Sequence, residues 1–393
     1  MELSLASTDI TTSYKSAMHN LTTNSEEYSE VFDPSRCGHL DLEIVLLVKY
    51  WFEGVLFMTF GGIGLFGALT TIAILSAKDL RTQLFNQLLI VLAILDILFI
   101  ACSVPTYSFD VFRWFKGNKI YYYLTLHFLY PMTPVMLHAT IFMTVALTVE
   151  RYLAVCKPFL FRSLNVKNSA ILRLTLYVLP VMVVSLVVNI PKFLDMKVVL
   201  ENNTIEADYS EASKDPSYLL YYTIWELIHP TVTTGIAPMA GIAIMSTSIF
   251  VTVRRSNSLR ILITGIEAER RHRISEKRLA IVLFGIVTMH FVCHLPMVII
   301  NIGAQIYIRD KFYCEEHGLN YFPPTWVLCG SSVSALLLMA NASCNFFIYC
   351  FTLRSFKTKL NQIRETGLHK INKLSRQNSA MSSSGNATDI ILI

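Results

Sequence analysis

The chain of 393 residues is strongly apolar: 53% of its residues are hydrophobic, 16% are charged, and its mean hydropathy is positive. That charge density lies well below the value typical of a soluble domain, and the formal net charge at pH 7 is a modest +5. The composition therefore excludes an ordinary soluble protein and indicates one that crosses a membrane several times.

Seven apolar runs are long enough to cross a bilayer as helices, which takes about 20 residues each. In chain order they cover residues 51–76, 84–107, 121–153, 169–191, 218–253, 279–307 and 325–350. The sequence thus predicts an all-α membrane protein: a seven-helix transmembrane bundle at 45–352, preceded by an N-terminal tail at 1–44. Because the number of spans is odd, the two termini lie on opposite sides of the membrane.

Basic residues indicate which side is cytoplasmic, because Lys and Arg accumulate there. Residues 254–278 carry eight of them, whereas the first 44 residues carry eight acids and two basic residues. We therefore expect a plasma-membrane protein with an extracellular N-terminus, whose first helix acts as its own signal anchor. The glycosylation sequons at Asn20 and Asn202 fall on the expected outer face.

The second span contains an acid, Asp96, in the string Leu92-Ala-Ile-Leu-Asp96. A carboxylate inside the membrane is costly and must face the bundle interior, where it meets a polar partner or a cation. A lone hydrogen-bonded Asp would satisfy this requirement. Thr140 in the third span, with Asn341 and Asn345 one helical turn apart in the seventh, favours a polar cluster instead.

The third span ends in Glu150-Arg151-Tyr152, and Pro158-Phe159 follow. One interpretation is a plain stop signal, in which the charges mark the water interface and the proline ends the helix. The later spans add further motifs: Pro238 in the fifth, Cys293-His294-Leu295-Pro296 in the sixth, and Asn345-Phe-Phe-Ile-Tyr349 in the seventh.

After the seventh span, apolar residues recur at helical spacing between basic ones. This pattern predicts a short amphipathic eighth helix at 353–364, lying on the lipid of the inner leaflet. The serine-rich residues 365–393 are expected to form a disordered, phosphorylatable tail.

These motifs, in this order, resemble those of rhodopsin-like (class A) G-protein-coupled receptors. Within that family the strings Asn189-Ile-Pro-Lys-Phe193, Phe291-Val-Cys293 and Asn345-Phe-Phe-Ile-Tyr349 are most similar to FMRFamide-type neuropeptide receptors of invertebrates. The resemblance implies a receptor for an extracellular peptide that activates heterotrimeric G proteins, with arrestin and receptor kinases acting on the tail.

The resemblance also implies roles for individual residues. Arg151 would pair with Glu150 and with Glu276 of the sixth helix in the inactive state, and Phe159 would contact the G protein. The activation switch would further include His294, Pro296, Asn345 and Tyr349. Asp96, Thr140, Asn341 and Asn345 would form the family's allosteric sodium site; no other cofactor and no nucleic-acid partner is expected.

The expected ligand is an amidated, cationic peptide ending in Arg-aromatic. The N-terminal tail and the second outer loop are both net acidic, which concentrates cations at the mouth of the bundle, although charged loops also serve solubility alone. Asp110 and Glu226 would hold the peptide guanidinium. By resemblance, Tyr130, Thr133, Met297, Asn301 and Ser331 would line the pocket beneath.

Two cysteines, Cys37 and Cys314, fall on the expected outer side, where free thiols rarely persist. Receptors of this family usually join the top of helix three to the second outer loop, but Leu126 stands there and residues 192–217 contain no cysteine. We therefore expect a Cys37–Cys314 disulfide in its place. Two unpaired or intermolecular thiols, or Cys329 as the true partner, remain alternatives.

Other departures from the family pattern are Ala68 for asparagine in helix one, His294 for tryptophan and Phe346 for proline. Rival function classes have less support. A transporter or channel would need inverted repeats and several midplane charges, and no nucleophile–base–acid constellation supports an enzyme. A seven-helix receptor for a non-peptide ligand remains the alternative.

Overall fold

A computed structural model of the chain describes residues 34–38, 41–78, 80–115, 118–167, 169–193, 196–201, 204–209, 231–260, 267–307 and 321–352, with isolated positions in 310–319 and 356–365. Two compact units divide the chain. One comprises Met1–His39 with Arg309–Phe322, and the other comprises Leu40–Ile308 with Pro323–Ile393.

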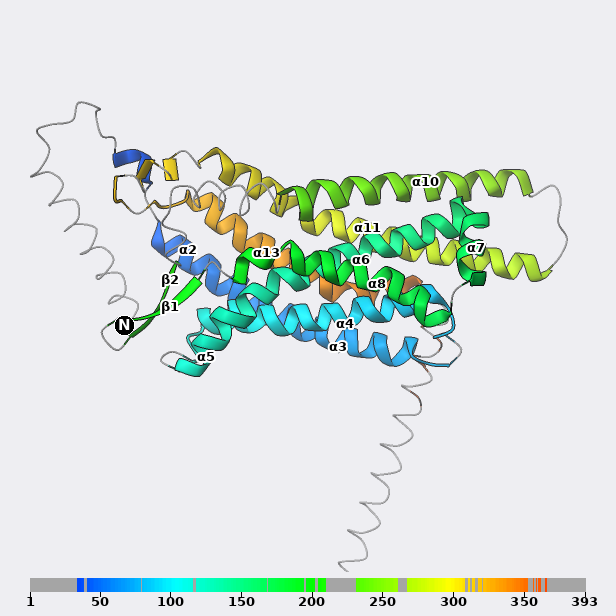
Figure 1. Cartoon of the computed structure of the whole chain (residues 1–393), viewed down its shortest axis with the longest axis horizontal. Helices are drawn as coiled ribbons and strands as arrows, with labels where there is room; N and C mark the ends of the chain where they lie inside the picture. The colour runs from blue at the N-terminus through cyan, green and yellow to red at the C-terminus, as the bar shows by residue number, and fades with distance from the viewer. Residues whose placement is uncertain are drawn as a thin grey trace, which may run out of the picture. The chain divides into compact units, whose positions relative to one another are not determined.

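The larger unit is a helical bundle whose long helices run along a common direction (Figure 1). Seven helices in the described part of the chain are long and apolar enough to cross a membrane, so the predicted bundle is confirmed. In chain order these spans consist of α2 (Leu42–Lys49), η2 (Tyr50–Leu56) and α3 (Phe57–Leu75); α4 (Leu84–Val104) and η3 (Pro105–Phe109); α5 (Lys119–Leu124), η4 (Thr125–Leu129) and α6 (Tyr130–Cys156); α8 (Ala170–Val187); η8 (Thr231–Ile236) and α10 (Ala237–Arg260); α11 (Glu267–Ile306); and α13 (Thr325–Thr352).

Shorter elements connect the spans. Helix α7 (Pro158–Lys167) follows the third span, and η5 (Ile190–Phe193) follows the fourth. Strands β1 (Met196–Glu201) and β2 (Thr204–Tyr209) then form an antiparallel hairpin that pairs Met196 with Tyr209 and Glu201 with Thr204. The sequence reasoning did not foresee this hairpin. The eighth helix stays a prediction, because most of 353–364 lies outside the described residues.

Glycines in the first span allow α3 to approach α4 and α13 closely. A Cβ at Gly64 would lie 2.5 Å from Ser343 Oγ and 2.9 Å from Ile100 Cδ1, whereas a Cβ at Gly62 would meet nothing within 4 Å. In lipid, where apolar side chains gain little by leaving the tails, close backbone contact of this kind is what holds helices together. One face of α3 is therefore built for contact and the other faces outward.

Burial separates central from peripheral helices. Within the most apolar window of each span, 67% of the third span is buried but only 11% of the fourth. The main apolar cluster lies between α3, α4, α6 and α13 and includes Leu88, Leu92, Ala139, Met143 and Met339. Large apolar side chains such as Ile171 and Leu179 of α8 are exposed. An exposed apolar surface of this extent requires lipid around it.

Candidate ligand-binding and activation sites

A cavity of about 300 Å³ lies within the larger unit, lined from η3, α6, α11 and α13 and from the chain around η5 and η8. Five side chains that the sequence predicted for the ligand pocket line it together: Tyr130, Thr133, Met297, Asn301 and Ser331. Apolar side chains such as Leu137, Ile300 and Leu338 make up much of the remaining wall. Mostly apolar walls with a few convergent polar groups are typical of a ligand site.

The two acids predicted to flank the cavity are only partly described. Asp110 is exposed and is not among the lining residues, while Glu226 lies outside the described residues. Among the described lining side chains the formally charged one is Lys192, whose Nζ lies 6.0 Å from the centroid of the Tyr130 ring. Asp110 and Glu226 were expected to flank the mouth above the pocket, so their role stays a prediction.

Four hydroxyl groups of the cavity wall donate their hydrogens to the backbone. Thr106, Thr133 and Ser334 each donate to the backbone carbonyl one turn earlier, at 2.8 Å, and Ser331 donates to the Leu328 carbonyl at 2.7 Å. Since each hydroxyl has a single hydrogen, these groups offer only lone pairs to a ligand. These four groups therefore present hydrogen-bond acceptors to the cavity.

Histidines lie at and below the cavity. His138 lines the cavity; its Nδ1 lies 2.8 Å from the Pro134 carbonyl and 3.1 Å from Asn189 Nδ2, and its Nε2 lies 3.4 Å from Thr233 Oγ1. His294 stacks on His290 with ring centroids 4.0 Å apart. Both rings are buried, and in the described part of the chain His294 Nδ1 and both nitrogens of His290 lack hydrogen-bond partners.

The structure assembles part of the predicted sodium cluster. Asn345 Nδ2 donates to Asp96 Oδ2 at 2.8 Å, and both residues are buried. Thr140 donates to the Leu137 carbonyl at 2.8 Å, which leaves the lone pairs of its oxygen available. Asn341, one turn before Asn345, makes no hydrogen bond to the carboxylate among the described residues. Tyr349 is buried beneath, 1% exposed.

The charged pair at the inner end of α6 is buried and bidentate. Arg151 Nε lies 2.5 Å from Glu150 Oε2 and Nη2 lies 3.0 Å from Oε1, with the two residues 7% and 1% exposed. The guanidinium also stacks over the Phe85 ring at 4.2 Å. A simple marker of the water interface would be exposed, so this geometry favours a conformational role for the pair over a stop signal.

The remaining residues of the predicted switch are only partly described. Glu276 lies on α11, but its side chain lies outside the described residues, so its pairing with Arg151 stays a prediction. Helix α11 continues through Pro296. Phe159, on α7, is 89% exposed and is therefore accessible to a partner.

The model of the 7 transmembrane receptor (rhodopsin family) matches residues 68–349, most of the chain. The chain belongs to this family. The receptor is 26% identical over 332 residues to the FMRFamide receptor of Drosophila melanogaster, covering 79% of this chain and 53% of that protein. It is 22% identical over 365 residues to an FMRFamide peptide receptor of Caenorhabditis elegans, covering 84% and 78% respectively.

Family membership confirms the resemblance drawn from the motifs and agrees with the expectation that the protein is not an enzyme. It also disfavours the transporter or channel alternative, since this family consists of signalling receptors. The receptor spans about half the length of the Drosophila relative, 53%.

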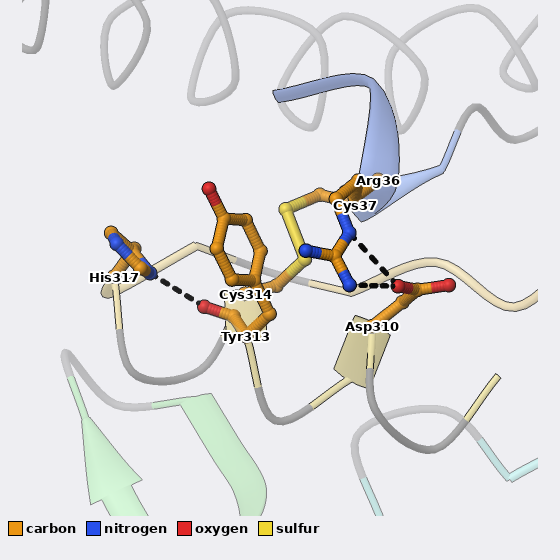
Figure 2. The surroundings of a disulfide bond; sticks show 6 residues. All are labelled: Arg36, Cys37, Asp310, Tyr313, Cys314 and His317. Atoms are coloured by element: carbon orange, nitrogen blue, oxygen red, sulfur yellow. Dashed lines mark hydrogen bonds and ion pairs between the residues drawn. A yellow bond between two sulfur atoms is a disulfide. The ribbon is translucent and has the colours of Figure 1, made fainter. Parts of the chain in front are cut away.

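The receptor contains the predicted disulfide, in its smaller unit. Cys37 and Cys314 are bonded, with Cα atoms 5.7 Å apart, and both side chains are buried. Figure 2 shows Arg36 beside the bond, pointing toward Asp310. Arg36 Nη2 lies 2.8 Å from Asp310 Oδ1, and the guanidinium lies 4.4 Å from the centroid of the Tyr313 ring. Cys329, the alternative partner, is a free thiol on α13. The glycosylation sites Asn20 and Asn202 lie outside the described residues.

Glu53 in η2 is an acid of the receptor that was not predicted from the sequence. Its side chain is 9% exposed and accepts a hydrogen bond from Ser332 Oγ at 2.6 Å. The same rule that selected Asp96 would have found it, because Glu53 interrupts an apolar membrane span.

Proposed function

We propose that the protein is a plasma-membrane receptor, with an extracellular N-terminus, for a cationic, amidated neuropeptide of the FMRFamide class, and that it activates heterotrimeric G proteins. Two relatives bear FMRFamide receptor names, and the acidic outer segments favour a cationic ligand. The exposed Phe159 would contact the G protein, and the serine-rich tail would recruit kinases and arrestin.

The size of the cavity supports insertion of one end of a peptide only. At about 300 Å³ it lies at the lower limit of ligand pockets. That volume suits an aromatic side chain with its terminal group, so the rest of a peptide would lie further out. The apolar wall of Leu137, Ile300 and Leu338 would receive the ring.

The proposal rests on four hydroxyl groups of the cavity wall whose hydrogens are already used in hydrogen bonds to the backbone. Thr106, Thr133, Ser331 and Ser334 present lone pairs to the cavity because their hydrogens are bonded to the backbone. A terminal carboxamide has two N–H donors to offer such a wall, whereas a terminal carboxylate has acceptors only. A carboxylate buried against these hydroxyl oxygens would leave the acceptors on both sides without water and without donors, which costs about 1–3 kcal/mol for each group.

The test compares amidated peptides with their free-acid counterparts on cells expressing the full chain, with a second-messenger readout. We expect a peptide amide ending in Arg-Phe to be more potent than the acid by at least about 10-fold, the factor for roughly 1.4 kcal/mol. Lys192→Met serves as the control, since Lys192 is the described lining charge that could attract a carboxylate. Equal potency of acid and amide would contradict the proposal, and a response to non-peptide ligands alone would favour the alternative.

A further inference from the structure

Glu53 is a carboxyl side chain buried within an apolar membrane span. It lies within the first span, is 9% exposed, and among the described residues its carboxylate has one hydrogen-bond donor, Ser332, and no ion-pair partner. Lys49 stands one turn earlier on the same helical stretch without forming an ion pair with it. A buried carboxylate held by a single hydroxyl lacks compensation for the water it has lost.

The neighbours of Glu53 connect it to the ligand cavity. Ser332 follows the lining residue Ser331, and Ser108, which donates to the Glu53 backbone carbonyl at 2.6 Å, follows the lining residue Tyr107. The Tyr107 ring also packs at 5.4 Å against Phe57, one turn after Glu53. Glu53 therefore bonds to residues that adjoin the lining residues of the second and seventh spans.

The two charges near the cavity belong to different walls. Lys192 follows the fourth span and lies over Tyr130 of the third, whereas Glu53 contacts the second and seventh. A cationic group of a ligand would be attracted toward Glu53. Asp110, which we had expected to hold such a group, is exposed to solvent, where an ion pair contributes little.

We propose that Glu53 is the residue that binds the basic side chain of the ligand, in a subsite between the first, second and seventh spans. This assignment rests on the proposed function and adds to it the direction in which the peptide lies. The aromatic amide occupies the cavity, and the guanidinium of the preceding residue passes Tyr107 to pair with Glu53. Ser332 holds the carboxylate in place through its hydrogen bond.

A two-by-two experiment tests the pairing. The binding of FMRFamide and of its analogue with citrulline in place of arginine is measured on membranes carrying wild-type or Glu53→Gln receptor. Citrulline keeps the shape of arginine without its charge, and glutamine can still accept from Ser332. We expect the wild type to prefer the arginine peptide by at least about 30-fold, as for a buried charge pair, and the variant to lose that preference.

Controls separate this role from folding. Glu43→Gln removes an exposed acid from the same span and should keep the full preference for arginine. Ser332→Ala keeps the Glu53 side chain but removes the hydrogen bond that holds its carboxylate in place, so it should reduce the preference for arginine. This variant tests the subsite even if Glu53→Gln fails to reach the surface. An unchanged preference in either subsite variant overturns the assignment of Glu53. If the wild type binds neither peptide, the proposed function fails and the assignment with it.

Discussion

Removal of the Cys37–Cys314 disulfide should destabilise the receptor measurably. The two cysteines are separated by 277 residues, and the chain-entropy model assigns about 5–6 kcal/mol to closing a loop of that length. This value is an upper bound, because six membrane spans lie within the loop and the bilayer already restricts their ends. We therefore expect a loss of about 2–4 kcal/mol, the usual range for a native disulfide.

The assay is thermal unfolding of purified receptor in detergent, with Cys37→Ser/Cys314→Ser compared with wild type. A drop in melting temperature of roughly 3 °C or more is expected. Cys329→Ser is the matched control, since that thiol is free, and it should leave the melting temperature unchanged. Arg36→Ala should also have little effect, because its ion pair with Asp310 is partly exposed and worth about 0–1 kcal/mol.

Two results would refute this reasoning. The first is an unchanged melting temperature in the double variant. That result would mean that the bilayer and the packing of the helices already restrict the chain as much as the disulfide does. The second is a non-reduced digest in which mass spectrometry finds both cysteines as free thiols. If Arg36→Ala destabilised the receptor as much as the loss of the disulfide, the ion pair rather than the covalent bond would hold this unit together.

Further predictions concern the bundle itself. Gly64→Ala should destabilise the receptor by about 1–3 kcal/mol, because the new Cβ meets α13, whereas Gly62→Ala should be neutral; equal thermal stability of the two variants would contradict this. Glu150→Gln should raise basal second-messenger signalling at matched surface expression, because it weakens the charge pair of Arg151; unchanged basal signalling would count against a conformational role. Asp96→Asn should remove any effect of sodium on agonist binding, and sodium dependence identical to wild type would exclude the proposed site.

The sequence was sufficient for features that follow from the high free-energy cost of leaving a polar group unpaired in the membrane. A run of about 20 apolar residues leaves a backbone few choices besides a membrane helix, so the seven spans were predictable. Asp96 must find a polar partner for the same reason, and Asn345 provides one. The five lining residues followed from the family resemblance, not from composition.

Features that depend on competition between partners were harder to predict. The Thr140 hydroxyl donates to the Leu137 carbonyl, an option open to any threonine in a helix, and its oxygen keeps lone pairs for a cation, so its place at the sodium site stays a prediction. Asp110 follows a π-helical turn whose direction the sequence does not reveal. The β1–β2 hairpin did have a local signal: two runs rich in β-branched residues flank Asn202-Asn203, a dipeptide suited to a tight turn.

Phe346 in place of the family's proline has a mechanical consequence. Helix α13 contains no proline among its 28 residues, so no ring interrupts its ladder of backbone hydrogen bonds, and the usual point of flexure is missing. Phe346 also packs on Gly67 of α3, where a Cβ would lie 2.7 Å from the phenylalanine Cβ. Without a point of flexure, and packed in this way on α3, helix α13 should move as a rigid body. A displacement of Ser332 at its outer end would therefore be transmitted to Tyr349 at its inner end.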